Sequence, residues 1–325
     1  METAVSQQDF QMIETNGIRL RVAVAGRGPL VVLIHGWPES WYSWRHQIAA
    51  LAAAGYRVAT PDVRGYGGSD RPAAIEAYDM ASMTADIAGL IGALGEDRAA
   101  LIGHDWGAPI AWNTALLHAD RVRAVAGLSV PYTGPGPAPF IDVARQVYKD
   151  KFFYQIYFQE PGLAEAELEA DVRDSLRKIY YWISGEGLRA QPPRAKPADA
   201  KLLDGLGDPG EFPAWMGPAD LDYYVAQFEE SGFRGPLNRY RNWHRDFALL
   251  SPLAAQRIQQ PAAFIAGTLE PVLNFVPGVD LVATMREKLA DLRFVEMIEG
   301  AGHWVQQERP EEVNQALLRF LAEVA

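Results

Sequence analysis

The sequence predicts an α/β protein with a mostly parallel central sheet, flanked by helices and interrupted by a helical insertion. Apolar, β-rich segments alternate with helical segments through residues 1–131, no convincing β-run follows in 132–248, and the alternation returns in 249–325. Strand–helix alternation at this spacing implies right-handed crossovers between parallel strands. We therefore expect a core formed by 1–131 with 249–325, and a helical cap domain formed by 132–248.

The individual elements follow from apolar runs and their end signals. Residues 30–34 form a continuous apolar run, which suits a strand buried on both faces. The helix expected at 41–54 ends at Gly55, where a left-handed cap needs no Cβ. The expected strands are 18–25, 30–34, 57–60, 99–103, 122–129, 262–266 and 293–298. The expected core helices are 41–54, 82–94, 106–118 and a final one with Val313, Leu317, Phe320 and Leu321 on one face.

Within the insertion, two features stand out. Residues 191–218 are rich in Pro, Gly and Ala and are expected to form a long loop, which in a compact protein is usually a lid element or a linker. After it, a helix is expected to begin with Asp220 as N-cap and to end at Gly232. Its apolar stripe consists of Leu221, Tyr224, Val225 and Phe228.

Charge and cysteine content exclude several classes of function. The formal net charge is −11, which disfavours binding to nucleic acid or to anionic membrane surfaces. There are no cysteines, so disulfides, thiolate nucleophiles and Cys-ligated metals are excluded. The first ten residues lack the pattern of a secretory signal, and no apolar run approaches the roughly 18 residues of a spanning helix. We expect a soluble, cytoplasmic protein.

The motif that indicates chemistry lies where the strand expected at 99–103 meets the helix expected at 106–118. The intervening sequence places Gly103 and Gly107 on either side of Asp105. In the nucleophile elbow of the α/β-hydrolase fold, flanking glycines permit a sharp strand-to-helix turn that presents the central residue above the sheet. Asp105 is therefore the expected nucleophile.

An aspartate in this position indicates the kind of bond that is attacked. A serine attacking sp³ carbon would form an ether, which histidine and water could not hydrolyse. A carboxylate attacking sp³ carbon forms an ester, which the remainder of a triad hydrolyses well. Asp105 therefore favours alkyl transfer from an epoxide or alkyl halide over esterase activity.

The candidate base is His303, which lies in a small-residue loop at 300–304, just before the terminal helix. Nucleophile, acid and histidine follow one another in this order in the α/β-hydrolase fold. We expect His303 to take a proton from the water that cleaves the ester. His35 and His104 flank important loops and are expected to hold them in shape.

The acid that orients His303 should follow a strand. Between Asp246 and Asp280 the only carboxylate is Glu270, directly after the strand expected at 262–266. Glu299, beside the histidine loop, is the rival candidate. We expect Glu270 to be the orienting acid.

An oxyanion hole is expected from two backbone amides. The segment 35–38, His-Gly-Trp-Pro, follows the strand at 30–34. One amide from this loop and the amide after the nucleophile would bind the tetrahedral intermediate. These are the N–H groups of Trp37 and Trp106.

With these residues in place, the chain closely resembles the soluble epoxide hydrolases of the α/β-hydrolase fold. The resemblance covers nearly the whole sequence. It rests on HGWPESWYSWR from His35, RGYGGSD from Arg64, GHDWGA from Gly103, YFQEPG from Tyr157, GFRGPLNRYRNW from Gly232 and GAGHW from Gly300.

The resemblance implies two lid tyrosines that hydrogen-bond the epoxide oxygen, and by motif match these are Tyr157 and Tyr240. A neutral phenol can donate a hydrogen bond to the alkoxide formed on ring opening. The resemblance also implies a cis peptide before Pro38. The other tyrosines of the region, Tyr154 among them, are expected to pack in the lid core.

Two departures from the family pattern are visible. Arg239 occupies a position where the family often has Trp, so the wall beside Tyr240 is expected to be more polar. The orienting acid is Glu270 where Asp is commoner, and the loop around Leu269 and Pro271 must accommodate the extra methylene.

Two alternatives use the same fold. Haloalkane dehalogenases share the Asp elbow followed by Trp, but they lack the tyrosine pair and frequently have Asn where this chain has Trp37. A non-catalytic ligand-binding protein of this fold would usually have lost the nucleophile or the base. Halide release from a chloroalkane would favour the first alternative, and epoxide binding without turnover the second.

The expected substrate is a small apolar or aryl epoxide, with water as the second reactant. The apolar face expected in the lid consists of Phe152, Phe153, Ile156, Phe158 and Trp182. No metal or organic cofactor is expected, and a homodimer is possible.

Overall fold

A computed structural model describes residues 9–191 and 194–324 and contains one eight-stranded sheet. The strand order is β1-β2-β4-β3-β5-β6-β7-β8. The strands are β1 (Asp9–Thr15), β2 (Ile18–Ala25), β3 (Leu30–Ile34), β4 (Arg57–Pro61), β5 (Ala99–His104), β6 (Val122–Leu128), β7 (Ile258–Gly267) and β8 (Leu289–Ile298). β1 and β2 pair antiparallel with their neighbours, and all pairs from β4 to β8 are parallel.

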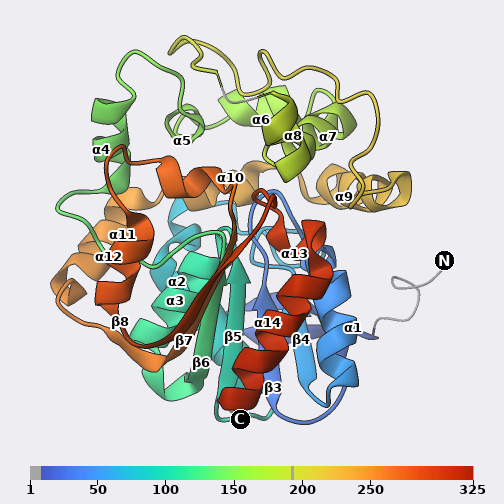
Figure 1. Cartoon of the computed structure of the whole chain (residues 1–325), viewed down its shortest axis with the longest axis vertical. Coiled ribbons are helices and arrows are strands. Elements are labelled where there is room, and N and C mark those ends of the chain that lie inside the picture. The colour runs from blue at the N-terminus through green and yellow to red at the C-terminus, as the bar shows by residue number, and fades with distance from the viewer. Residues whose placement is uncertain (1–8, 192–193, 325) are drawn as a thin grey trace.

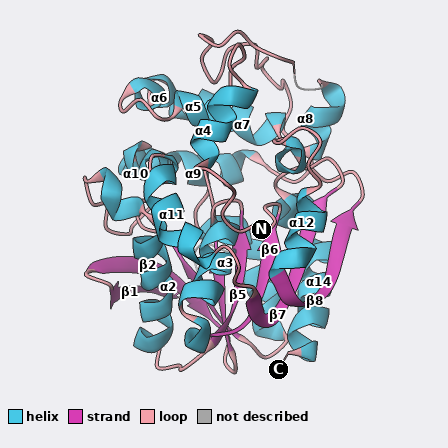
Figure 2. Ribbon diagram, turned by 90° about the vertical axis from the view of Figure 1, so that its left-hand side faces the viewer, coloured by secondary structure: helices cyan, strands magenta, loops and turns pink. Residues whose placement is uncertain are grey.

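The middle of the sheet is buried on both faces. Every residue of β3 and β5 is buried, as their apolar sequences require. The core helices are α1 (Arg45–Ala53), α2 (Met80–Ala93), α3 (Gly107–Leu117), α12 (Leu281–Lys288), α13 (Val305–Glu308) and α14 (Pro310–Glu323). Helices α1 and α14 pack side by side over one face, and α2 and α3 pack together over the other (Figure 1, Figure 2).

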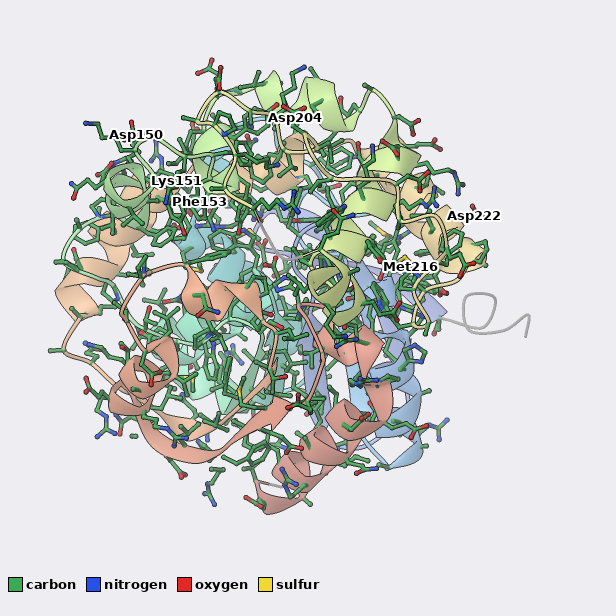
Figure 3. All side chains as sticks on the ribbon, turned by 45° about the horizontal axis from the view of Figure 1, so that its top comes forward. Asp150, Lys151, Phe153, Asp204, Met216 and Asp222 are labelled. Carbon is green, nitrogen blue, oxygen red and sulfur yellow. The ribbon has the colours of Figure 1, made fainter. Side chains whose placement is uncertain are left out.

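The insertion lies over one end of the sheet, between β6 and β7 (Figure 1). Its helices are α4 (Phe140–Val147), α5 (Tyr154–Tyr157), α6 (Leu163–Leu168), α7 (Val172–Trp182), α8 (Gly185–Ala190), α9 (Pro218–Ser231), α10 (Arg234–Tyr240) and α11 (Trp243–Leu250). The exposed Asp150, Lys151, Asp204 and Asp222 mark its outer surface in Figure 3. We keep 132–248 as the proposed cap, although its expected end falls inside α11, which contacts both α2 and α4.

Short 3₁₀ helices lie between the longer elements. They are the 3₁₀ helices η1 (Trp41–Trp44), η2 (Ile75–Tyr78), η3 (Ala119–Arg121), η4 (Ser251–Leu253) and η5 (Pro271–Asn274). The helix expected at 41–54 is thus divided into η1 and α1 at Arg45.

Several further elements differ from the sequence predictions. β1 was not predicted, although Asn16 and Gly17 form the left-handed turn that joins it to β2. Helix α12 was not predicted either. Helix α9 begins at Pro218 rather than at Asp220, because the Asp220 carboxylate accepts the Gly217 N–H at 2.8 Å from within the first turn.

Candidate active site

The turn between β5 and α3 places the Asp105 carboxylate above the sheet. Asp105 has a φ of 49°, in the left-handed region that a non-glycine residue rarely adopts. A Cβ at Gly103 would collide with the backbone of Gly107, and one at Gly107 with the backbone of Ile34. The two glycines therefore permit the close passage of chain that holds Asp105 in this strained conformation.

One backbone amide binds a carboxylate oxygen of Asp105. The Trp37 N–H donates to Asp105 Oδ1 at 2.7 Å, and the Trp37–Pro38 peptide is cis, as the resemblance implied. A Cβ at Gly36 would collide with Asp105 and with the amide nitrogen of Trp106. The loop after β3 and the start of α3 thus bring both expected amides beside the carboxylate.

His303 lies between two carboxylates. Its Nδ1 lies 2.9 and 3.0 Å from the two oxygens of Glu270, and its Nε2 lies 3.4 Å from Asp105 Oδ2. Glu270 is buried, whereas Glu299 is exposed. Glu270 Oε1 also accepts the Val272 N–H at 2.9 Å and so caps η5, which accommodates the longer side chain.

Burial and neighbouring charges shift the pKa values of these groups in opposite directions. Burial lowers the pKa of His303, but Glu270 and Asp105 outweigh it, and the pKa lies well above its ordinary value. Burial raises the pKa of Asp105, but the bond and charge of His303 and the Trp37 amide bring it below the ordinary value. Both shifts favour the charged forms, an ionised Asp105 beside an imidazolium.

The His303 backbone is held by a buried network. His104 Nε2 lies 2.7 Å from the His303 carbonyl oxygen, to which Ser129 also donates at 2.8 Å. His104 Nδ1 lies 2.8 Å from Oε2 of the buried Glu39. His35 accepts the Val63 N–H at Nε2 and lies 2.9 Å from a carbonyl through Nδ1. Both histidines hold loops, as predicted.

Two tyrosines from the cap lie near the nucleophile. Tyr240, on α10, is 1% exposed and packs edge-on against the rings of Trp106 and Trp37, with centroids 5.1 and 6.0 Å away. Tyr154, on α5, packs against Tyr240 with centroids 5.9 Å apart. Burial, and then the charge of Asp105, raise the pKa of both phenols, so both are neutral donors at neutral pH.

Tyr157 does not join this group. Its hydroxyl donates to Glu167 at 2.8 Å, and the same carboxylate accepts the N–H groups of Leu202 and Leu203. Tyr157 therefore helps to hold the long cap loop. The structure brings Tyr154, which was expected in the lid core, to the position that Tyr157 was expected to occupy.

Comparison with known proteins identifies the family of the chain. A family model for the alpha/beta hydrolase fold matches residues 29–207. Epoxide hydrolase A of Mycobacterium tuberculosis is 48% identical over 314 residues, covering 96% of each chain. Epoxide hydrolase B of the same organism is 39% identical, covering 91% of this chain and 92% of its own. The crystal structure of epoxide hydrolase A from Mycobacterium thermoresistibile superimposes with a TM-score of 0.92 at 46% identity, over 98% of this chain and 99% of that one.

The chain belongs to the epoxide hydrolases of the α/β-hydrolase fold. In this epoxide hydrolase a cavity of about 500 Å³ reaches Asp105. Its wall is mostly apolar, with aromatic side chains from Trp106, Trp112, Phe140, Tyr154, Trp243, Phe247 and Phe275 among others. None of the five lid side chains expected to form the apolar face lines the cavity, and α5 contributes Tyr154 and Gln155 to its wall instead.

The Arg239 side chain, which departs from the family pattern, is buried and does not line the cavity. Arg239 is 2% exposed, forms an ion pair with Asp246, donates to the Tyr78 carbonyl oxygen and lies 4.7 Å over the Trp106 ring. Of the pair, only Asp246 lines the cavity. The polar group that reaches the cavity is therefore Asp246 and not Arg239.

The residues that the structure describes are 9–191 and 194–324. In this part of the epoxide hydrolase no three His, Asp or Glu side chains are grouped so that they could hold a metal ion. No helix in the same residues has both the length and the apolar character needed to cross a membrane.

Proposed function

We propose that the protein hydrolyses an epoxide to a vicinal diol through a covalent alkyl ester on Asp105. The observation that carries the proposal is the carboxylate nucleophile beside His303, which is itself paired with Glu270. The epoxide hydrolases that the chain resembles over nearly their full length support the choice of substrate.

In the first step, Asp105 Oδ2 attacks one oxirane carbon, because Oδ1 is engaged by the Trp37 amide. The carbon–oxygen bond of the epoxide breaks, and its oxygen takes a proton from Tyr154 or Tyr240. The resulting tyrosinate takes the proton of the His303 imidazolium, which leaves His303 neutral for the second step. Tyr154 accepts a hydrogen bond from Gln155 at 2.9 Å, which leaves its own proton free to donate. We assign the second donor to Tyr154, in place of Tyr157. Hydrogen bonds that strengthen as charge develops lower the barrier.

In the second step, His303 takes a proton from water and the hydroxide attacks Cγ of Asp105. The Trp37 and Trp106 amides stabilise the resulting oxyanion. Collapse of the intermediate breaks the bond between Cγ and the former Oδ2, and the departing alkoxide takes the proton of the new carboxyl group. The diol leaves with the former Oδ2, so that one oxygen of the regenerated carboxylate comes from water. Glu270 keeps His303 oriented and stabilises its positive charge.

A single turnover in ¹⁸O-labelled water with excess enzyme tests the ester. We expect unlabelled diol and label in the peptide that contains Asp105. Label in the first-turnover diol, with none in Asp105, would show that water attacks the epoxide directly and would refute the proposal.

A trapping experiment separates formation of the ester from its hydrolysis. His303→Gln should allow alkylation but block hydrolysis, so that the intact mass rises by the mass of the epoxide. Asp105→Asn is the matched control and should form no adduct. Faster release of chloride from a chloroalkane than of diol from styrene oxide would favour dehalogenation instead.

Two further properties concern where the protein is found in the cell and how it assembles. We expect a cytoplasmic enzyme, which subcellular fractionation checks. A homodimer is a possible assembly, which light scattering of the purified protein checks.

A further inference from the structure

The cavity that reaches the nucleophile extends from Asp105 along one face of α3. At its inner end it is lined by Asp105, Trp106 and Tyr154, and it then follows one face of α3 through Pro109, Trp112 and Asn113. An α-helix rises 1.5 Å per residue, so Asn113 lies roughly 10 Å along the helix from Trp106. The cavity is thus a deep pocket that begins at the reacting carboxylate.

Packed aromatic rings lie beside the carboxylate at Trp37, whose amide holds Asp105 Oδ1. Trp37, Phe158 and Tyr240 are 6%, 0% and 1% exposed, and none of them lines the cavity. Their ring centroids lie 5.2 Å apart for Trp37 and Phe158, 5.0 Å for Phe158 and Tyr240, and 6.0 Å for Trp37 and Tyr240. Because protein interiors are close-packed, this aromatic wall leaves no room for a second long substituent.

The pocket has the size and character for one large apolar group. Its volume of about 500 Å³ lies in the range that holds drug-sized ligands, so an epoxide of only a few carbons would leave most of it unfilled. Beyond the inner end, the wall includes Phe140, Val143, Phe247 and Phe275. An alkyl or aryl arm gains the most from burial against such a surface.

We infer that the substrate is an epoxide with a single long apolar arm. One oxirane carbon carries the arm, which lies along α3, and the other carries hydrogen or a small group that faces the aromatic wall. This inference rests on the proposed function and specifies its substrate class. Terminal, lipophilic epoxides fit this shape, whereas epoxides flanked by two long arms do not.

The test compares two isomers of the same composition, 1,2-epoxydecane and trans-5,6-epoxydecane, with purified full-length protein. We expect kcat/KM for the terminal isomer to exceed that for the internal isomer by about 100-fold, since the misfit of even one methylene in a pocket costs roughly 10- to 200-fold. A ratio of tenfold or more supports the inference, and a smaller ratio overturns it. If neither isomer nor styrene oxide is hydrolysed, the proposed function fails instead.

Two phenylalanine-to-alanine variants show which part of the site discriminates between the two isomers. Phe158→Ala removes a ring from the aromatic wall and should raise the internal-to-terminal ratio of kcat/KM at least tenfold. Phe247→Ala removes the same ring from the arm side and should not raise that ratio. Equal changes in the two variants, or no change in either, would overturn the inference. Phe158→Leu serves the same purpose if the alanine variant does not fold.

A series of substrates of increasing length measures the depth of the pocket. Across 1,2-epoxyalkanes from butane to decane, kcat/KM should rise by about fourfold per methylene until the pocket is filled, as expected for burial of CH₂ groups. Asn113→Phe shortens the pocket and should reduce the decane-to-butane ratio of kcat/KM at least tenfold. An unchanged ratio would show that the arm does not lie along α3.

Discussion

At the scale of single residues, one turn of helix separates a proposed catalytic tyrosine from a structural one. Tyr154 and Tyr157 are the first and last residues of α5, yet Tyr154 lines the cavity and Tyr157 donates to Glu167. The sequence motif Tyr-Gln-Ile-Tyr-Phe contains both phenols and does not distinguish between them. Their different partners decide their roles.

Tyrosine-to-phenylalanine substitutions should separate these two roles. Tyr154→Phe should slow formation of the alkyl-enzyme by roughly 10²- to 10³-fold, the usual cost of losing one donor to a developing oxyanion. Tyr157→Phe should change this rate by less than about threefold and lower the free energy of unfolding by about 1 kcal/mol, the value of one hydrogen bond. Stopped-flow tryptophan fluorescence and urea unfolding measure the two effects. The reverse order of alkylation rates would return the catalytic role to Tyr157.

The pKa of His303 should depend on the charge of Asp105. In the free enzyme two carboxylates raise this pKa well above its ordinary value, against the effect of burial. Esterification removes the charge of Asp105, so the pKa should fall and His303 should lose its proton and act as a base. The rate of ester hydrolysis should therefore decrease as the pH falls through the pKa of the alkyl-enzyme.

Alkylation should respond differently to pH. Asp105 has a lowered pKa, so it stays ionised and alkylation should be nearly constant between about pH 5 and 9. Single-turnover kinetics resolve the two steps. A parallel loss of both rates at low pH would contradict this account, as would an unchanged His303 pKa in Asp105→Asn measured by ¹⁵N NMR.

At the scale of elements, a buried ion pair joins α10, α11 and α2. Arg239 on α10 pairs with Asp246 on α11, whose Oδ1 accepts the Met80 N–H at 2.7 Å at the start of α2. The guanidinium also covers the ring of Trp106, the residue that follows the nucleophile. The pair therefore supports the wall on which Tyr240 and Trp106 pack.

Removing one member of this pair should be far more damaging than removing both. Arg239→Met or Asp246→Asn alone leaves a buried group without its partner, which typically costs about 3–5 kcal/mol of unfolding free energy. The double variant should lose less than either single variant, because no unpaired charge remains. Urea midpoints at unchanged m-values measure this. Additive losses in the double variant would show that the pair is not coupled.

At the scale of the whole molecule, the catalytic loop is bonded to both core and cap. The His303 N–H donates to the carbonyl of Ile183 in the cap at 2.8 Å, while Ser129 at the end of β6 holds its carbonyl. Buried bonds also run from Tyr180 on α7 to the Pro38 carbonyl and from the Trp304 indole to the Tyr180 carbonyl, at 2.6 and 2.8 Å. The cap is thus part of the structure that positions the base.

Cap and core should consequently unfold together. We expect loss of activity, tryptophan fluorescence and far-ultraviolet circular dichroism to share one midpoint in urea, because the interface between cap and core is buried and hydrogen-bonded. Tyr180→Phe removes one of these bonds and should lower all three midpoints together. Loss of activity at clearly lower urea than loss of helix would show that the cap opens first.

The placement of Asp105, His303 and Glu270 together could be predicted from the sequence because it follows from local signals and chain order. Glycines at 103 and 107 permit the turn, and the strand–loop positions of Glu270 and His303 bring them to the same edge of a parallel sheet. Strands that are buried on both faces, such as β3, could also be predicted from their continuous apolar sequences. The edge strand β1 was missed because a half-exposed strand has a weaker apolar pattern.

Only the tertiary structure decided which tyrosine faces the nucleophile, where Arg239 finds its counter-ion and on which side of Asp105 the cavity lies. Each of these depends on side chains that are distant in sequence and packed together by the cap, such as Trp37, Phe158 and Tyr240. A local motif specifies backbone geometry over a few residues, whereas the direction of a side chain on a short helix depends on the partners that folding brings to it.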